Sequence, residues 1–202
     1  FEVGIKTIDG LLTCGKGQKV GIFAGSDVGK TTLMGMIVRG SNAPVKVVAL
    51  IDKQDSEVPE FIQKNLGEDS TNTVLAEDDD MSDPIADQSR SILDGHIVLS
   101  RDLSDLGIYP PINIQNSASH VMGDVITPNH QRYVTQFRRY NSMVKENEIL
   151  LRIGAYQKGS NMGLDTPIEK RSPMERFMQQ TPSEVVPFKK SIETLEADFY
   201  YA

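Results

Sequence analysis

Cysteine and histidine are both scarce in this sequence, which limits the covalent and metal chemistry open to it. The 202 residues include one cysteine, Cys14, and three histidines. A single cysteine excludes an internal disulfide framework and favours a reducing compartment. His96 and His130 stand alone, without the spacing of a metal site, and Cys14 is interpreted as a small core residue.

Positive charge and long apolar runs are scarce as well. The chain has 21 lysines and arginines against 28 acidic residues, a net charge of −7. A protein that holds nucleic acid through its phosphates needs a basic face, so this balance argues against nucleic-acid binding. No apolar run reaches the length of a membrane-spanning helix, and the first residues do not resemble a signal peptide. Because the sequence starts at Phe1 rather than at methionine, we expect it to be part of a longer protein.

Short apolar runs predict a parallel sheet covered by helices. Residues 18–24, 45–52 and 96–100 have the composition of buried strands, and an apolar helix is predicted directly after the first. Strand, helix and strand at this spacing form a βαβ unit. A short helix is expected at 57–66 and a solvated acidic loop at 76–84. The predicted fold is therefore α/β.

The pattern changes at Thr127, where a helical C-terminal region is predicted. Thr127 and Pro128 form an N-cap and first-turn proline pair. Beyond residue 152 the sequence is polar, and four prolines (Pro167, Pro173, Pro182 and Pro187) are expected to break it into short pieces. We predict two units, a nucleotide-binding core at 1–126 and a helical region at 127–202. One apolar stripe is expected along the helix, formed by Tyr133, Phe137, Tyr140, Val144 and Leu151.

The stretch A-G-S-D-V-G-K-T at 24–31 carries the strongest motif. It matches the phosphate-loop pattern G-x-x-x-x-G-K-[ST] except at Ala24. In such loops backbone N–H groups and the helix dipole face the phosphates, the lysine neutralises them, and the threonine hydroxyl holds Mg²⁺. We interpret 24–31 as a P-loop rather than an ordinary strand–turn–helix connection. The predicted nucleotide-binding residues are Gly25, Ser26, Asp27, Val28, Gly29, Lys30, Thr31 and Thr32, with Thr31 also the metal ligand.

Asp27 is unexpected in a loop that binds a polyanion. A carboxylate close to a phosphate costs on the order of several kcal/mol unless it turns to solvent or to Mg²⁺. Glycine at this position could adopt a positive φ freely, which aspartate tolerates less well. Two interpretations are open: the side chain faces the phosphates and weakens nucleotide binding, or it points outward without effect.

Four stretches in order resemble the ATPase of type III secretion and flagellar protein export, a relative of the catalytic subunit of rotary ATP synthases. They are "GIKTIDGLLTCGKGQKVGIFAGSDVGKTTLM", "SILDGHIVLSRDL", "GIYPPINIQNSASHVM" and "LLRIGAYQKGSN". The likeness covers about 1–66 and 82–180 and accounts for Ala24, because this family's loop commonly starts A-G-S. It implies a P-loop core of the RecA-like type with a helical C-terminal region.

Two positions depart from the family pattern in ways that bear on hydrolysis. Lys53 stands where the family has the glutamate that polarises water, and an ammonium group cannot accept a proton from water. His120 stands where the family has an arginine that reaches the neighbouring subunit's site, and histidine is a weaker, mostly neutral group at pH 7. Arg101 would compensate only if it faced an interface, and a surface role is favoured for it. The resemblance thus gives the catalytic positions as Lys30, Lys53 and His120.

A central segment is also absent between Leu75 and Ala76, where the family has the Walker B strand and its aspartate. Asp52 ends an apolar run and would be the substitute magnesium ligand, but an ordinary next strand is the favoured interpretation of that run. Removal of central strands would leave apolar sheet edges unpaired. We therefore expect that the sequence lacks a segment or has been altered.

The resemblance implies an ATPase that powers type III protein export by releasing chaperones and unfolding secreted proteins. Its cofactors would be ATP and Mg²⁺. Its partners would be five further copies in a hexameric ring, export chaperones and secreted proteins, and the stalk and stator of the apparatus, in the cytoplasm or at the inner face of the membrane. Lys53, His120 and the missing segment favour instead a relative that binds nucleotide, or serves a structural role, without hydrolysis. A P-loop small-molecule kinase is a weak third alternative because no acceptor-site signature is present.

Overall fold

The computed structural model describes all residues except 26, 51–72, 76–92 and 200–202. The strand predicted at 18–24 is β1, Val20–Phe23, and the helix after the loop is α2, Lys30–Gly40. The strand predicted at 96–100 is β4, Gly95–Val98. The helix predicted at 57–66 and the acidic loop at 76–84 lie outside the described residues.

The sheet that carries the phosphate loop is formed by segments far apart in the chain. β1 pairs in parallel with β4, with Val20 opposite Gly95 and Phe23 opposite Val98. The short strand β5, Ala118–Ser119, pairs with β4 on its other side in the antiparallel direction. Among the described residues, β1 therefore stands at the edge of its sheet.

In the described part of the chain, the second predicted strand begins at Val48 rather than at residue 45, and it does not pair with β1. β2, Val48–Leu50, pairs in parallel with β3, Thr73–Leu75, in a separate two-stranded sheet. The βαβ interpretation was correct about parallel pairing and named no partner for either strand; β1 pairs with β4, and β2 pairs with β3. The helix that connects two parallel strands does not determine which strands pair in the sheet. Contacts between residues far apart in the chain determine that.

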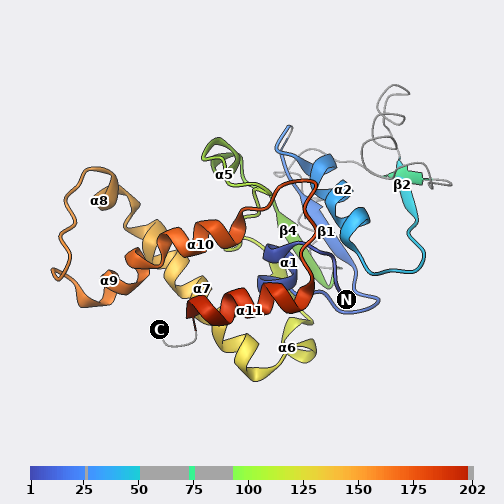
Figure 1. Cartoon of the computed structure of the whole chain (residues 1–202). Helices are drawn as coiled ribbons and strands as arrows, with labels where there is room; N and C mark the ends of the chain where they lie inside the picture. The colour runs from blue at the N-terminus through green and yellow to red at the C-terminus, as the bar shows by residue number, and fades with distance from the viewer. Residues whose placement is uncertain (26, 51–72, 76–92, 200–202) are drawn as a thin grey trace.

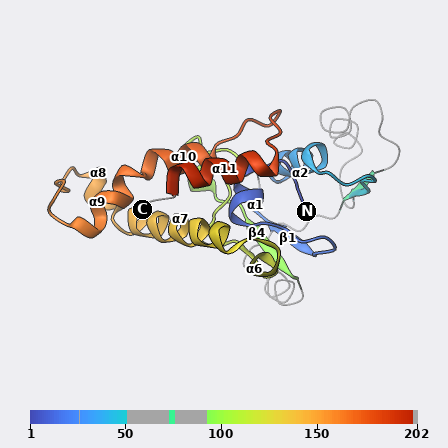
Figure 2. The same ribbon diagram turned by 60° about the horizontal axis from the view of Figure 1, so that its bottom comes forward.

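A helical region packs against one end of the sheet (Figure 1). α7, Pro128–Glu146, begins as predicted, because the Thr127 hydroxyl accepts a hydrogen bond from the N–H of His130 and Pro128 occupies the first turn. Figure 2 shows α10 and α11 along one side of α7, with α8 and α9 at the end of α7 away from β1 and β4. The remaining helices are α1 Lys6–Leu11, α5 Arg101–Asp105, α6 Met122–Val125, α8 Glu148–Arg152, α9 Met162–Glu169, α10 Arg171–Met178 and α11 Phe188–Phe199.

Two details of the predicted helical region were wrong. α7 ends at Glu146, so Leu151 lies on α8, although it still packs against the same core. Pro167 lies inside α9 rather than at a break, whereas Pro173 lies in the first turn of α10, and Pro182 and Pro187 fall between α10 and α11. The interruption falls at Lys170, because the ring of Pro173 would clash with the carbonyl of residue 169 in a continuous helix.

α1 is shared between two hydrophobic cores. Its Leu11 belongs to the core of the helical region, which includes Phe137 and Phe177. Its Ile8 belongs to the core around the phosphate loop, with Leu33 and other residues. α1 therefore joins the two parts of the molecule.

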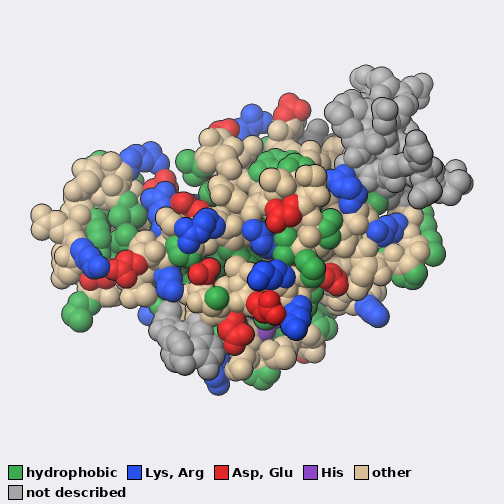
Figure 3. All heavy atoms as spheres, viewed as in Figure 1, with side chains coloured by type: hydrophobic (Ala, Val, Ile, Leu, Met, Phe, Trp, Pro, Cys, Tyr) green, Lys and Arg blue, Asp and Glu red, His purple; other side chains and the backbone are tan. Residues whose placement is uncertain are grey.

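The surface agrees with the charge balance of the sequence. Figure 3 shows acidic and basic side chains interspersed over the face seen in Figure 1, without a large basic area. None of the described helices combines the length and the apolar character needed to cross a bilayer.

Arg138 of α7 connects the helical region to the sheet through backbone carbonyls. Its guanidinium donates to Ile114 O at 2.7 Å, Ser117 O at 3.2 Å and Leu11 O at 3.3 Å. Burial lowers the pKa of this arginine. One side chain thus satisfies acceptors on α1 and on the segment that leads into β5.

We expect Arg138→Met to lower the free energy of unfolding by about 2–3 kcal/mol, because it leaves partly buried carbonyls without donors. Urea unfolding followed by circular dichroism measures this. The neighbouring Arg139 is exposed, so Arg139→Met is a matched control that should change stability by less than about 0.5 kcal/mol. Equal effects of the two substitutions would contradict the proposed anchoring.

Candidate nucleotide-binding site

The phosphate loop lies between β1 and α2, as the motif predicts. Ala24 and Val28 are buried in the core around the loop, whereas Asp27 is exposed. α2 begins at Lys30 after Gly29, and the Leu33 N–H donates to Gly29 O at 2.9 Å. No side chain caps the start of α2. The start of α2 thus directs its first turn and the positive end of the helix dipole toward the loop, an arrangement that favours an anion.

Two residues of the loop have left-handed backbone conformations. Gly29 has φ +96° and Asp27 has φ +60°, the one positive φ at a described residue other than glycine. The loop keeps at Asp27 a conformation that glycine adopts more easily. The side chain of Asp27 is exposed, as it would be in either orientation, so both interpretations of this position stay open.

Tyr109 is a site residue that the sequence analysis missed. Its hydroxyl occupies the position that a side chain at Gly29 would need. Only glycine therefore fits at position 29, for a reason of space as well as of backbone conformation. No local pattern relates positions 29 and 109, so the sequence gives no signal for this contact.

Gln180 holds Tyr109 in place from the helical side. Its N–H donates to Tyr109 O at 2.7 Å, and its buried side chain donates to Gly4 O at 2.8 Å and Glu184 O at 2.9 Å. The Gln180 side-chain oxygen accepts from the N–H of Lys6 at 2.9 Å. The segment after α10 is thereby connected to both α1 and the residue that packs on the phosphate loop.

His120, the position predicted to act on a neighbouring subunit, is not brought to the loop within this chain. His120 follows β5, which pairs with Gly95 and His96 at the start of β4, whereas the loop follows Phe23, opposite Val98 at the end of β4. His120 is exposed, donates its N–H to Asp94 O at 2.9 Å, and its ring meets the edge of His96. Ser26, Lys53 and Asp52 lie outside the described residues. Arg101 is exposed at the start of α5.

The remaining candidates take structural roles in the described part of the chain. Burial raises the pKa of the Cys14 thiol to about 11, with a smaller contribution from Asp9. His130 is buried and donates to Gly10 O at 2.7 Å, and its burial lowers its pKa. Within the described ranges no three His, Cys, Asp or Glu residues gather as metal ligands.

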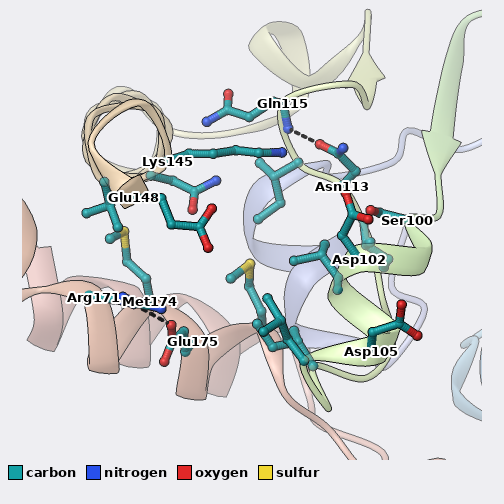
Figure 4. Close-up of a pocket in the computed structure, with 18 of the residues that line it drawn as sticks. Ser100, Asp102, Asp105, Asn113, Gln115, Lys145, Glu148, Arg171, Met174 and Glu175 are labelled. Carbon is teal, nitrogen blue, oxygen red and sulfur yellow. Dashed lines mark hydrogen bonds and ion pairs between the residues drawn. The ribbon is translucent and has the colours of Figure 1, made fainter. Parts of the chain in front are cut away.

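A cleft of about 420 Å³ lies apart from the phosphate loop, between α5 and the helices α7, α8 and α10. Figure 4 shows Asp102 and Asp105 on one side of it and Lys145, Glu148 and Arg171 on the other. Arg171 pairs with Glu175 at 2.8 Å. No residue of the phosphate loop lines this cleft. The candidate nucleotide site is therefore located by the loop motif and its backbone geometry rather than by a cavity.

Comparison with known proteins agrees with this geometry. The family model described as "ATP synthase alpha/beta family, nucleotide-binding domain" matches residues 4–75 and 69–119, more than half of the chain. The chain belongs to the ATP synthase alpha/beta family. A second model, "T3SS EscN ATPase C-terminal domain", matches 126–197 and assigns it to the branch of type III secretion and flagellar ATPases.

Individual relatives support the same branch. The chain is 41% identical over 290 residues to the flagellum-specific ATP synthase of Helicobacter pylori strain J99, covering 97% of this chain and 67% of the relative. It superposes on the assembled ATPase EscN of enteropathogenic E. coli with a TM-score of 0.86 and 30% identity, covering 98% of this chain and 70% of EscN. For EscN in complex with its central stalk EscO the TM-score is 0.85 at 29% identity, with the same coverages.

The alignments also agree with the predicted absence of a central segment. The stretch aligned with the H. pylori relative is 290 residues long, although this chain has only 202. The two ranges matched by the nucleotide-binding model overlap at 69–75, next to Leu75 and Ala76, between which the missing segment is predicted. The chain spans about two thirds of the length of this relative.

We expect opposite stability changes from two substitutions of Asp27 that remove the same charge. Asp27→Gly should raise the free energy of unfolding by up to about 1 kcal/mol, because glycine adopts φ +60° without steric cost. Asp27→Ala should lower it by about 1 kcal/mol, because alanine loses the local tolerance of aspartate for this conformation. Thermal unfolding of the three proteins measures the difference. Equal shifts for Gly and Ala would indicate an effect of charge alone.

We expect Gly29→Ala to weaken nucleotide binding at least about tenfold, because the added methyl group must displace Tyr109 and the backbone is left-handed. Gly17 has φ +80° with open space around it, so Gly17→Ala is a matched control for backbone strain alone. Calorimetric titration with ATP compares them. Unchanged affinity in Gly29→Ala would show that the geometry at position 29 is unimportant for binding.

Proposed function

We propose that this chain is the nucleotide-binding part of an ATPase that powers type III protein export. The observation that supports it best is the loop between β1 and α2, with left-handed Gly29 directly before the uncapped first turn that carries Lys30, Thr31 and Thr32. Membership of the export branch supports the role in export. The ligand would be ATP with Mg²⁺.

Each loop residue has a role in this proposal. The backbone N–H groups of 25–32 surround the phosphates, and Lys30 places its ammonium group on them. Thr31 provides a hydroxyl to Mg²⁺, and Thr32 adds a further N–H donor in the first turn. In this proposal the exposed carboxylate of Asp27 turns away from the phosphates, so that it costs binding energy only through its longer-range charge.

The assembly and partners are proposed from the relatives. EscN has been solved as an assembled ATPase and in complex with its central stalk. By analogy we propose a homo-hexamer that contacts a stalk and a stator, with export chaperones and secreted proteins as substrates. Its place would be the cytoplasm, next to the inner face of the membrane. The units proposed are 1–126 for nucleotide binding and 127–202 for the helical region.

In a ring, the position of His120 fits a role in trans. It lies at the opposite end of β4 from this chain's own phosphate loop, as a group that serves the neighbouring subunit would. Histidine in place of arginine and Lys53 in place of glutamate both weaken transition-state stabilisation. These two substitutions support a second candidate function, a subunit that binds nucleotide but turns it over poorly.

We expect Lys30→Ala to weaken ATP binding by at least about 2 kcal/mol, because it removes a charge-assisted contact to the phosphates. Titration calorimetry with Mg-ATP measures this, and Lys19→Ala, an exposed lysine before β1, is a control that should not change affinity. Equal affinity of Lys30→Ala and the parent protein would contradict the proposed nucleotide site.

A steady-state ATPase assay separates the two candidate functions. Turnover above about 1 s⁻¹ that Lys30→Ala abolishes would support the ATPase and exclude the deficient relative. Intact binding without turnover would support the second candidate. In that case Lys53→Glu alone should restore little activity, because catalytic groups act as a unit and His120 would remain.

A further inference from the structure

A groove of about 620 Å³ runs between α7 and α9, in the helical region away from the phosphate loop. On α7 it extends from Gln131 to Met143, about 18 Å along the helix. The facing wall is the beginning of α9, from Met162 to Pro167. No residue of the proposed nucleotide site contributes to it.

The charge of this groove has one sign. Its only charged side chains are Arg132 and Arg139, seven residues apart on the exposed side of α7. Two helical turns separate them, a distance of about 10 Å along the axis. Neither arginine forms an ion pair with any residue that the structure describes. In a chain of net charge −7, this is a local concentration of positive charge.

The carboxylates of α9 do not neutralise these arginines, because they bind elsewhere. Asp165 accepts hydrogen bonds from the Tyr156 hydroxyl and the Gly159 N–H in the loop before α9. Glu169 pairs with Lys158 at 2.5 Å. Both acidic groups of the helix are thus engaged in holding its own loop.

The groove also offers flexible apolar contacts. Met162 is 86% exposed, and Met143 lies half-buried on the opposite wall. Tyr140 forms part of the wall with its hydroxyl accepting from the Gln136 amide at 2.8 Å. Methionine side chains adapt to varied partners, so Met143 and Met162 on the two walls suit the apolar side of a bound helix.

We propose that this groove binds an acidic amphipathic helix of a partner protein. Carboxylates seven residues apart on such a helix match the spacing of Arg132 and Arg139, and its apolar side would cover Met143 and Met162. A single phosphate cannot reach both arginines, and a membrane surface requires a larger basic cluster than two groups. The 420 Å³ cleft is a poorer candidate, because its charges of both signs include the internal pairs Arg171–Glu175 and Arg152–Glu148.

The test uses a fluorescein-labelled helical peptide of about five turns, with glutamates seven residues apart beside a leucine face. Fluorescence anisotropy should show saturable binding to the whole chain. Arg132→Gln/Arg139→Gln should weaken it at least about tenfold, and a peptide with glutamine in place of these glutamates should bind equally weakly. Lys189→Gln/Lys190→Gln on α11 removes the same charge from exposed lysines and is the matched control.

Further variants separate this proposal from general charge effects and from the nucleotide site. Arg139→Glu should recover binding to a peptide that has lysine at the corresponding glutamate. Lys30→Ala should leave peptide affinity unchanged. The proposed helix-binding groove and the proposed nucleotide site can therefore be contradicted separately. Circular dichroism checks that each variant is folded.

Four results would overturn the proposal. The first is no binding of the peptide at millimolar concentration, and the second is equal loss in the groove and α11 variants. The third is tighter, arginine-dependent binding to anionic lipid vesicles than to the peptide. The fourth is a self-association of the chain that the two arginine substitutions abolish, which would assign the groove to a second copy.

Discussion

The parallel pairing of β1 with β4 determines where the functional elements of this chain lie. The phosphate loop follows the end of β1, and the segment after β4 leads to Tyr109, which packs on Gly29. At the other end of β4, the pairing with β5 places His120 on the far side of the sheet. The two pairings of β4 thus place the phosphate loop and His120 at opposite ends of this strand.

The connection between the sheet and the helical region depends on polar side chains that reach backbone atoms. Arg138 donates to carbonyls of α1 and of the segment before β5. Gln180 joins α1 to Tyr109. Because hydrogen bonds are directional, they fix the relative orientation of the two parts more strictly than apolar contacts alone. A change at the phosphate loop that moved Tyr109 would therefore also displace Gln180 and α1.

Local features of the structure were predictable from the sequence, and long-range contacts were not. β1, α2, β4 and the start of α7 follow from short apolar runs, the G-K-T motif and the Thr127–Pro128 cap, all of which act over a few residues. The separation of β2 from β1 could not be predicted, because pairing depends on residues far along the chain. The same holds at the candidate site, where the motif predicts Lys30 and Thr31 as binding residues but gives no indication of the contact of Tyr109 with Gly29 or of Gln180 with Tyr109. The position of Pro167 inside α9 shows tertiary packing overriding local preference.

Burial of the only cysteine makes the chain a favourable subject for site-specific labelling. Cys14 lies in the core around the phosphate loop, and its thiol has a pKa of about 11, so it is almost entirely protonated at neutral pH. Maleimides and other alkylating reagents attack the thiolate, and a buried protonated thiol reacts slowly with them. A cysteine introduced at an exposed position would therefore accept a spin label or fluorophore with little background. Distances between the sheet and the helical region could then be followed during nucleotide addition without first removing Cys14.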